Sequence, residues 1–384
     1  MERFIYFFES LSIWVGRAFG WCILILTLSV TYEVFVRYVL NAPTVWVFDM
    51  MVQMYGGLFL MAGALQVLLS AKKSYLFNEE LSWIQENARF AVEFITRDAR
   101  MAGYFGCGSG TIVNTLNTTT GWEFKFDQGM GGFDGDDASY PSTDFSLPPT
   151  PAVTSGTFPK SDVFTVLRGA TEGESYNVTK HVTASSTIEL DGNPAFAKGR
   201  ILMISDCNHA AVFQHTGNNP GKAVHNPGGS TIPGNCTKGL GYPKTCTTQG
   251  VEYKYGGDAY VMEVLSHAYF IKTASNGVPA IYRQEITGGV TTLTEELVQG
   301  IESMQTFFGE DTDDDGVANR YVSAKDVTDW TTIVSLRLHL LTRSLTQVAS
   351  EAQPFRFVGT TYTPTDRYLR KEFITTVKIR NRGV

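Results

Sequence analysis

Alternating acidic residues in the C-terminal third of the chain are of a type and spacing that could bind a hard cation. Asp311, Asp313, Asp315 and Asn319 form the pattern D-x-D-x-D-G-x-x-N, with glycine at its sixth position. Ca2+ takes roughly six to eight oxygen ligands, which such a loop can supply, and the carbonyl of Val317 could add another. Because the twelfth position is not a glutamate, the segment departs from an EF-hand. It predicts a weak Ca2+ site and no other cofactor, with a solvated acidic turn as the alternative.

The five cysteines are a second candidate for chemistry. Cys22 lies in an apolar segment and is expected to be inert, whereas Cys107, Cys207, Cys236 and Cys246 lie in polar sequence. An even number in an exported domain favours two disulfides, of three possible pairings. Cys236 and Cys246 bracket a short loop with Gly and Pro, so we expect them to pair and to leave Cys107 with Cys207.

A zinc site is the alternative use of these residues. It would combine Cys207 with His209, His215, His225 and the remaining cysteines, but their spacing matches no common zinc framework such as paired CxxC. The chain also lacks a nucleophile elbow, a Walker sequence and a dinucleotide fingerprint. We therefore expect a structural protein rather than an enzyme. The net charge of -7 argues against a nucleic-acid partner.

Two long apolar segments near the N-terminus predict a transmembrane helical hairpin. Residues 13–36 and 50–69 are each long enough for a span of roughly 20 residues, and the sequence Asn41-Ala42-Pro43 between them indicates a turn. A cleaved signal peptide is the alternative for the first segment. The length of that segment, the charge of Glu33 and the lack of a small-x-small cleavage site argue against it.

Residues 37–64, RYVLNAPTVWVFDMMVQMYGGLFLMAGA, carry a family resemblance. The Arg-Tyr pair, the Asn-x-Pro turn, Trp46 and the Phe48-Asp49 pair before a Gly-rich segment resemble the small permease subunit of TRAP transporters, the DctQ family. The resemblance covers about residues 1–64 and implies solute transport with the TRAP large subunit as partner. Members of that family have two further spans, which this chain lacks.

Downstream of this region the spacing of apolar residues predicts a long amphipathic helix over residues 65–102. Leu81, Ile84, Ala88, Ala91, Ile95 and Ala99 recur three and four positions apart, and Gly103 is a suitable end. If the helix is unbroken from residue 50 to residue 102, its length is about 80 Å. Half in a membrane and half packed on a domain, it would have the form of a pilin stalk.

A second resemblance covers about residues 57–384. The segment SWIQENARFAVEFITRDARMAGYFGC at residues 82–107, SDC at 205–207, DTDDDGVANRYVSA from Asp311 and FITTVKIRNR near the end are similar to the PilW family of type IV pilus assembly proteins, which are minor-pilin-like. The resemblance implies an initiating or priming component of pilus assembly. Its partners would be other minor pilins, and it would be anchored in the bacterial inner membrane with its C-terminal domain in the periplasm.

The N-terminal region departs from the pilin pattern. In the pilin register the glycine cut by prepilin peptidase falls on Thr44, and the membrane glutamate falls on Asp49. The carboxylate is thus approximately kept, and the processing residue is not. A second span would also return the domain to the cytoplasm, where its cysteines would stay reduced, and in that case we expect poor assembly into pili.

Together these patterns predict an α+β protein. We expect a transmembrane hairpin over residues 1–64, a stalk helix over 65–102 and a mostly antiparallel β domain over 103–384, with strands beginning near residues 163, 200, 259, 268, 332 and 372. The first functional hypothesis is a pilus assembly component. The alternatives are a TRAP small-subunit fragment and a chimeric chain in which neither function is complete.

Overall fold

The computed structural model describes residues 2–42, 46–106, 111–117, 120–170, 175–228, 232–287 and 291–381. The chain divides into two compact units, Met1–Asn78 and Glu79–Val384. The first unit is helical and the second is built of β-sheets on the end of a helix. This is an α+β protein with mostly antiparallel sheets, as the sequence predicts.

The first unit consists of helix α1 (Glu2–Tyr38) and the first part of helix α2 (Trp46–Arg100). Many of their described large apolar side chains are exposed; Phe59, for example, is 80% exposed, whereas Leu26 and Val36 are buried. Segments Gly20–Tyr38 and Phe48–Arg100 are long and apolar enough to cross a membrane on length and composition alone. Helix α2 continues unbroken through residues 57–65, where the two family resemblances overlap.

Three hydroxyl groups of α1 are satisfied inside the helix. Thr27, Ser29 and Thr31 each donate to the carbonyl four residues earlier at 2.8 Å. Glu33 forms an ion pair with Arg37 one turn later, at 3.6 Å. Polar groups that are paired within their own helix can enter an apolar environment at lower cost, so these residues are compatible with a membrane span.

The described residues of the second unit form seventeen strands. They are β1 (Thr111–Asn114), β2 (Met130–Phe133), β3 (Val163–Gly169), β4 (Tyr176–Val182), β5 (Thr187–Leu190), β6 (Ile201–Ser205), β7 (His209–Gln214), β8 (Lys222–Val224), β9 (Tyr260–Thr273), β10 (Pro279–Thr287), β11 (Thr291–Gln299), β12 (Ile301–Glu310), β13 (Arg320–Val322), β14 (Ile333–Arg343), β15 (Phe355–Phe357), β16 (Thr360–Tyr362) and β17 (Arg370–Lys378). Short 3-10 helices are η1 (Trp122–Phe124), η2 (Thr183–Ser185), η3 (Ala324–Asp326) and η4 (Trp330–Thr332).

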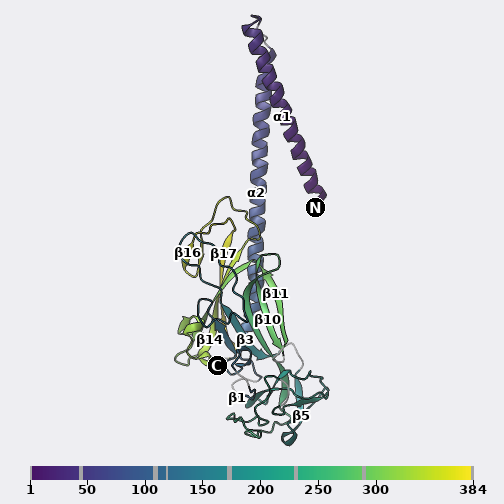
Figure 1. The fold of residues 1–384 in the computed structure, drawn as a ribbon, viewed down its shortest axis with the longest axis vertical. Helices are drawn as coiled ribbons and strands as arrows, with labels where there is room; N and C mark the ends of the chain where they lie inside the picture. Colours follow the sequence, from purple (N-terminus) through teal and green to yellow (C-terminus); the bar gives the residue numbers. More distant parts are fainter. Residues whose placement is uncertain are drawn as a thin grey trace. The chain divides into compact units, whose positions relative to one another are not determined.

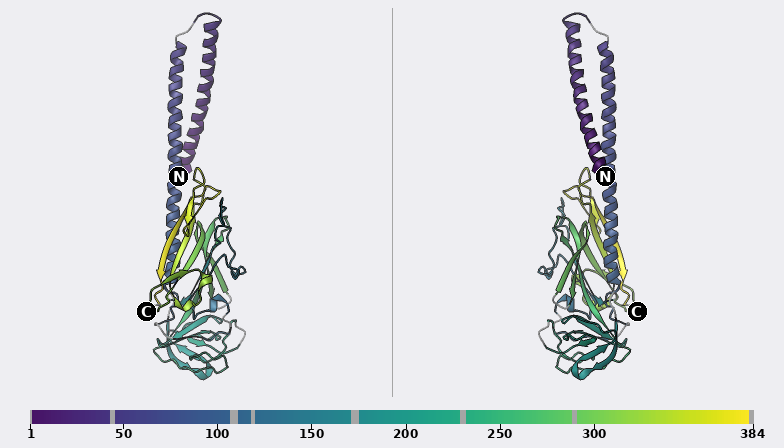
Figure 2. Two further views of the ribbon diagram at one scale, coloured as in Figure 1. Left: turned by 90° about the vertical axis from the view of Figure 1, so that its left-hand side faces the viewer. Right: turned by 90° about the vertical axis from the view of Figure 1, so that its right-hand side faces the viewer.

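Strand β9 joins the two parts of the largest sheet. Its first half pairs with β4 and β6, and its second half pairs with β3 and β10. The first part has the order β1-β7-β6-β9-β4-β5-β8, and the second has β2-β3-β9-β10-β11. The strands of the first part, drawn mostly in teal, gather at one end of the unit (Figure 2). The sequence predicts two strands, from residues 259 and 268; one strand of 14 residues forms instead, because no turn residue interrupts this run.

A second sheet has the order β13-β12-β14-β17, and β15 pairs with β16. Among the described strands every pairing is antiparallel except that of β1 with β7. The predicted strands near residues 163, 200, 332 and 372 correspond to β3, β6, β14 and β17. Strand β11 passes into β12 at Gly300, which has a φ of 81° that glycine adopts without strain.

The last part of α2 packs on both sheets (Figure 1). Ala91, Ile95 and Ala99 are fully buried in a cluster with Phe164, Ile281, Met304 and Leu338 from the strands. Small residues along this stripe let the helix backbone approach the sheets closely. The helix ends at Arg100, and Gly103, with a φ of 68°, lies three residues further along, near the end that the sequence predicts.

Candidate functional site

The predicted cation loop connects β12 to β13. The carboxylates of Asp311, Asp313 and Asp315 lie with one oxygen of each within 4.8 Å of the others. Asp311 is 6% exposed, and its two oxygens accept from the backbone N–H groups of Asp315 at 3.2 Å and Gly316 at 2.7 Å. These bonds hold the pKa of Asp311 below its usual range despite the opposing effect of desolvation. The carboxylate that organises the loop is thus ionised at neutral pH.

The remaining residues of the loop are partly engaged with one another. Asn319 Oδ1 accepts from the backbone of Thr312 at 2.6 Å, and its Nδ2 donates to Asp313 at 3.2 Å. The N–H of Val317 donates to Asp315 at 2.8 Å. Each carboxylate oxygen has more than one lone pair, so these bonds are compatible with a cation. The three carboxylates fit a hard cation, but they provide fewer than the roughly six oxygens that Ca2+ takes, and water would supply the rest.

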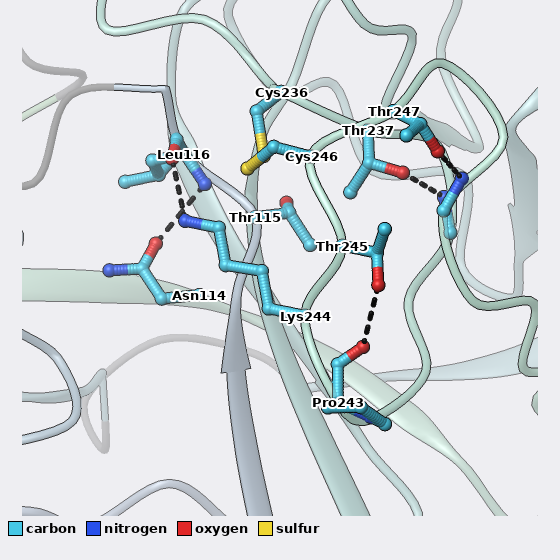
Figure 3. Close-up of a disulfide and its surroundings, with 12 residues drawn as sticks. Asn114, Thr115, Leu116, Cys236, Thr237, Pro243, Lys244, Thr245, Cys246 and Thr247 are labelled. Atoms are coloured by element: carbon cyan, nitrogen blue, oxygen red, sulfur yellow. Dashed lines mark hydrogen bonds between the residues drawn. A yellow bond between two sulfur atoms is a disulfide. The ribbon is translucent and has the colours of Figure 1, made fainter.

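The local disulfide is present between Cys236 and Cys246 (Figure 3). It closes a loop against the end of β1, where the N–H of Cys236 donates to the carbonyl of Thr115 at 2.8 Å. Lys244 Nζ donates to the carbonyl of Leu116 at 3.0 Å from the same loop. The disulfide therefore fixes an otherwise irregular segment beside the first part of the large sheet.

Cys207 is also disulfide-bonded, and Cys107, its predicted partner, lies outside the described residues. Cys207, Cys236 and Cys246 are disulfide-bonded in this structure and therefore offer no thiolate for the zinc alternative. His215 Nδ1 instead accepts from the N–H of Val224 at 3.0 Å. Two residues were placed by the pilin register. Asp49, at the position of the membrane glutamate, is exposed in the first turn of α2, and Thr44, at the cleavage position, lies outside the described residues.

Opening the local disulfide should weaken the second unit, Glu79–Val384. Replacing Cys236 and Cys246 together by serine is expected to lower the free energy of unfolding by about 2 to 3 kcal/mol, because a loop of this size regains conformational entropy when the chain unfolds. Urea unfolding followed by circular dichroism would measure the loss. Cys22→Ser, which removes a free cysteine from α1, is the control. An unchanged urea midpoint in the double variant would contradict the expectation.

A buried ionic cluster that the sequence analysis did not identify attaches α2 to the sheets. Asp98 on α2 is 4% exposed and accepts from Arg168 of β3 at 2.9 and 2.7 Å. Its other oxygen lies 2.5 Å from His267 Nδ1 and 2.6 Å from Tyr269 Oη, both on β9. A signal for this site exists in the sequence. Asp98 follows Ile95 by three positions and Ala91 by seven, so it belongs to the apolar stripe, where a carboxylate needs a partner.

The cluster fixes the charge of its members. Desolvation raises the pKa of Asp98, but hydrogen bonding to His267, its charge and that of Arg168 hold this pKa well below the usual range. Desolvation lowers the pKa of His267, but its hydrogen bonds to Asp98 and Glu285 raise that pKa above its ordinary value. The Glu285 carboxylate lies 3.3 Å from Nε2 of the ring. The imidazolium therefore joins a carboxylate of the helix to one of β10.

The stability that His267 contributes should depend on pH. Since its pKa is raised in the folded state, its contribution is complete below the unfolded pKa of about 6.5 and is lost as the pH rises through the folded value. Asp98 has the opposite sign, because its depressed pKa makes its contribution present above about pH 4 and lost in acid. We expect His267→Gln to cost more stability near pH 5 than near pH 9, as urea unfolding would measure. Equal costs at both pH values would contradict this.

A second buried ionic cluster joins three strands of the smaller sheet. Arg370 at the start of β17 donates to Glu302 of β12 at 2.6 and 3.0 Å and to Asp366 at 2.6 and 2.8 Å. Arg343 at the end of β14 lies 3.5 Å from Glu302. Most of the polar atoms in the two clusters contact one another, whereas Nε of Arg343 is buried without a hydrogen-bond partner. Their arrangement is suited to holding the helix and strands together.

The family resemblance is confirmed for the C-terminal part of the chain. No curated protein matches the sequence. Among solved structures, a type IV-like pilin from Thermus thermophilus is similar at 11% identity and a TM-score of 0.32, over 80% of this chain and 98% of that one. The resemblance of residues 37–64 to a transporter subunit stays a prediction. Residues 268–381, from within β9 to the end of β17, match the family model described as Type IV Pilus-assembly protein W.

Proposed function

We propose that this chain is a membrane-anchored, minor-pilin-like component of type IV pilus assembly with a structural role. The observation that carries the proposal is the match of residues 268–381 to the pilus-assembly family model. The matched residues form the strands β10 to β17 and the second half of β9, which include part of the surface on which α2 packs. We further propose that the chain acts through contacts with other pilus components rather than through catalysis.

Membrane attachment through α1 and the first part of α2 belongs to the same proposal. Two helical segments are long and apolar enough to span a bilayer, and their large apolar side chains are exposed. Exposure of Leu60 at 74% and Leu68 at 64% would be costly in water and favourable in lipid. The exported unit would then lie in the periplasm, where the Cys236–Cys246 disulfide persists.

The test is deletion of the gene in the organism that carries it, followed by complementation. We expect deletion to remove surface pili, counted by electron microscopy, and the full-length chain to restore them. Complementation with a chain that ends after residue 267 should fail, because it lacks the matched segment. A chain with Arg367→Ala, an exposed position in that segment, should restore pili and is the matched control.

Two outcomes would count against the proposal. Normal pili after deletion would remove it. A deletion strain with normal pili and defective uptake of a TRAP solute would favour the transporter alternative, with the TRAP large subunit as partner. A periplasm-active reporter fused after Gly103 measures topology separately, and an inactive reporter would place the C-terminal unit in the cytoplasm.

For the acidic loop we propose weak Ca2+ binding by Asp311, Asp313 and Asp315. We expect calorimetric titration of the full-length protein to show a dissociation constant of about 0.1 to 1 mM, in the range of extracellular sites with few charged ligands. Asp313→Asn should abolish the heat, because this residue is exposed and contributes to the cluster. Asp258→Asn, an exposed residue elsewhere, should leave it unchanged. No heat at millimolar Ca2+ would remove the idea.

A further inference from the structure

Strands β4, β5 and β8 form an extension of the largest sheet, and few strand-to-strand bonds attach it. Among the described residues, β4 pairs with β9 at two positions, Tyr176 opposite Val261 and Asn177 opposite Tyr260. Beyond these positions β4 pairs with β5, and β5 pairs with β8, so the remaining pairs lie inside the extension. Contacts outside the strand pairing therefore supply part of the attachment of this β4-β5-β8 extension.

Two buried imidazoles attach the extension to its surroundings as hydrogen-bond acceptors. Nδ1 of His181 on β4 accepts from the backbone N–H of Tyr255 at 3.2 Å. Nδ1 of His215, which follows β7, accepts from the N–H of Val224 at the end of β8 at 3.0 Å. A ring nitrogen that accepts carries no hydrogen, so in each neutral ring the hydrogen lies on Nε2. A further proton can then bind to Nδ1 alone, which is the accepting atom.

Protonation of these rings would break both attachments. An imidazolium has two N–H groups and no acceptor, so a proton on Nδ1 would face the backbone N–H of Tyr255 or Val224. The backbone group would lose its partner, and an unpaired backbone donor inside a protein is costly. The attachment of the extension thus depends on neutral rings.

A third imidazole, that of His225 just beyond β8, lies beside His181 with the two ring centroids 5.7 Å apart. His225 is 0% exposed, and neither of its ring nitrogens has a hydrogen-bond partner among the described residues. The ring of Phe213 on β7 lies 5.3 Å from it. A proton on His225 would therefore place a charge next to two other rings, without a hydrogen bond to a carboxylate in the described part of the chain.

The groups around His181 and His225 disfavour their protonated forms. Burial lowers the pKa of His181 to about 4; the charge of Lys254 acts in the same direction, and that of exposed Glu252 opposes it. Burial lowers the pKa of His225 to about 3, and a charge on His181 would lower that pKa further. Tyr255, whose ring centroid lies 6.0 Å from that of His181, stays neutral because burial raises its pKa.

His215 and the charged residues of the neighbouring strands complete these surroundings. Burial lowers the pKa of His215, although its backbone contacts with Gly217 and Val224 oppose this effect. Glu189 of β5 and Lys222 of β8 pair with each other at 3.8 Å and are partly exposed. These two charges therefore compensate each other at the surface of the extension.

We propose that the β4-β5-β8 extension is a pH-sensitive element that opens when His181, His215 and His225 become protonated. Rings that are released into water bind protons more strongly, so the closed form loses its advantage as the pH falls below about 6.5. The loss continues down to about pH 4 for His181 and about pH 3 for His225. Release of either of these two rings should favour the open form by about 20-fold between pH 7 and pH 5.

The response is local to one end of the second unit. His267, which joins α2 to the sheets, has the opposite sign, because its pKa is raised and its contribution is complete in acid. Acid should thus weaken the extension while it preserves the contribution of His267 at the helix. Opening would expose Ile188 of β5 and Ala223 of β8, which are fully buried in the closed form. This property goes beyond the proposed function and requires no pilus.

Hydrogen exchange of the purified full-length protein in detergent, followed by mass spectrometry at pH 7 and pH 5, tests the proposal. Each rate is corrected for the dependence of chemical exchange on pH. We expect protection in residues 176–190 and 222–225 to fall by about 20-fold or more at pH 5, and protection in β12 and β14 to stay unchanged. Equal protection of the extension at both pH values, or an equal loss in β12 and β14, would overturn the proposal.

Substitutions assign the response to the imidazoles. His181→Asn places an amide oxygen, which accepts but is not protonated in this range, near the position of Nδ1, and His225→Phe keeps a ring beside Phe213. We expect the two together to remove most of the acid response. His339→Gln, at a half-buried imidazole of β14 bonded to Glu372, is the control and should leave it unchanged. A full acid response in the double variant would overturn the assignment, and exchange of the unsubstituted protein decides the proposal where a variant is unfolded at pH 7.

Discussion

Asp98→Ala is expected to lower the free energy of unfolding of the second unit, Glu79–Val384, by about 3 to 5 kcal/mol. The substitution leaves Arg168 and His267 buried without the carboxylate that both contact; their side chains are 7% and 3% exposed. A buried charge that loses its partner retains the cost of desolvation without the compensating attraction. Tyr269 also loses its hydrogen-bond acceptor at 2.6 Å. The loss should detach the end of α2 from β3 and β9.

Chemical unfolding of the full-length protein in detergent, followed by near-ultraviolet circular dichroism, measures this effect. Glu93→Ala, an exposed position on the same helix, is the matched control and should change stability by less than about 0.5 kcal/mol. Replacing Asp98 and Arg168 together by leucine and methionine should cost less than Asp98→Ala alone, since no unpaired charge of this pair remains. A single variant as stable as the control would show that the cluster does not hold the helix.

Arg370→Ala, which acts on the four-stranded sheet, is also expected to lower the free energy of unfolding by about 3 to 5 kcal/mol. The guanidinium is 1% exposed and is shared between Glu302 and Asp366. Without it, Glu302, whose side chain is 5% exposed, keeps only the contact of 3.5 Å with Arg343. Arg370 of β17 lies opposite Arg343 of β14 in the sheet register, and both contact Glu302 of β12. The substitution would therefore remove the side chain that joins β17 to Glu302.

Arg370→Lys separates charge from geometry in this cluster. Lysine retains the positive charge but cannot contact two carboxylates through a planar fork, so we expect it to recover only part of the lost stability. Arg367→Ala, exposed three residues earlier, is the control. Urea unfolding of the three variants measures their order of stability, and we expect Arg370→Ala to be the least stable. Full recovery by lysine would show that charge alone is sufficient at this position.

Local patterns in the sequence predict the helices and several strands correctly. The period of three and four residues from Leu81 to Ala99 identifies the face of α2 that is buried, and Gly103 marks the region of its end. Continuous apolar runs identify β3 and β14. These features depend on neighbouring residues alone, so a single sequence contains the information.

Contacts between distant residues could not be predicted in the same way. Asp98 and His267 are 169 residues apart, and only the fold brings them together. Likewise Asp162 on the segment before β3 accepts from the N–H of Thr306 on β12 at 2.8 Å, which no local pattern indicates. The Asp311 loop is the exception, because all its members lie within nine residues and a turn is enough to assemble them.

The continuity of β9 has a mechanical consequence. Strand β9 has 14 residues, and each of its halves is hydrogen-bonded to a neighbouring strand on both sides. The two halves belong to different parts of the largest sheet, and no loop separates them. A force applied along this strand would load many backbone hydrogen bonds in shear at the same time, rather than opening them one after another. A load applied at the β4 and β6 end of this strand would thus be passed along a single bonded backbone toward its other half, which pairs with β3 and β10.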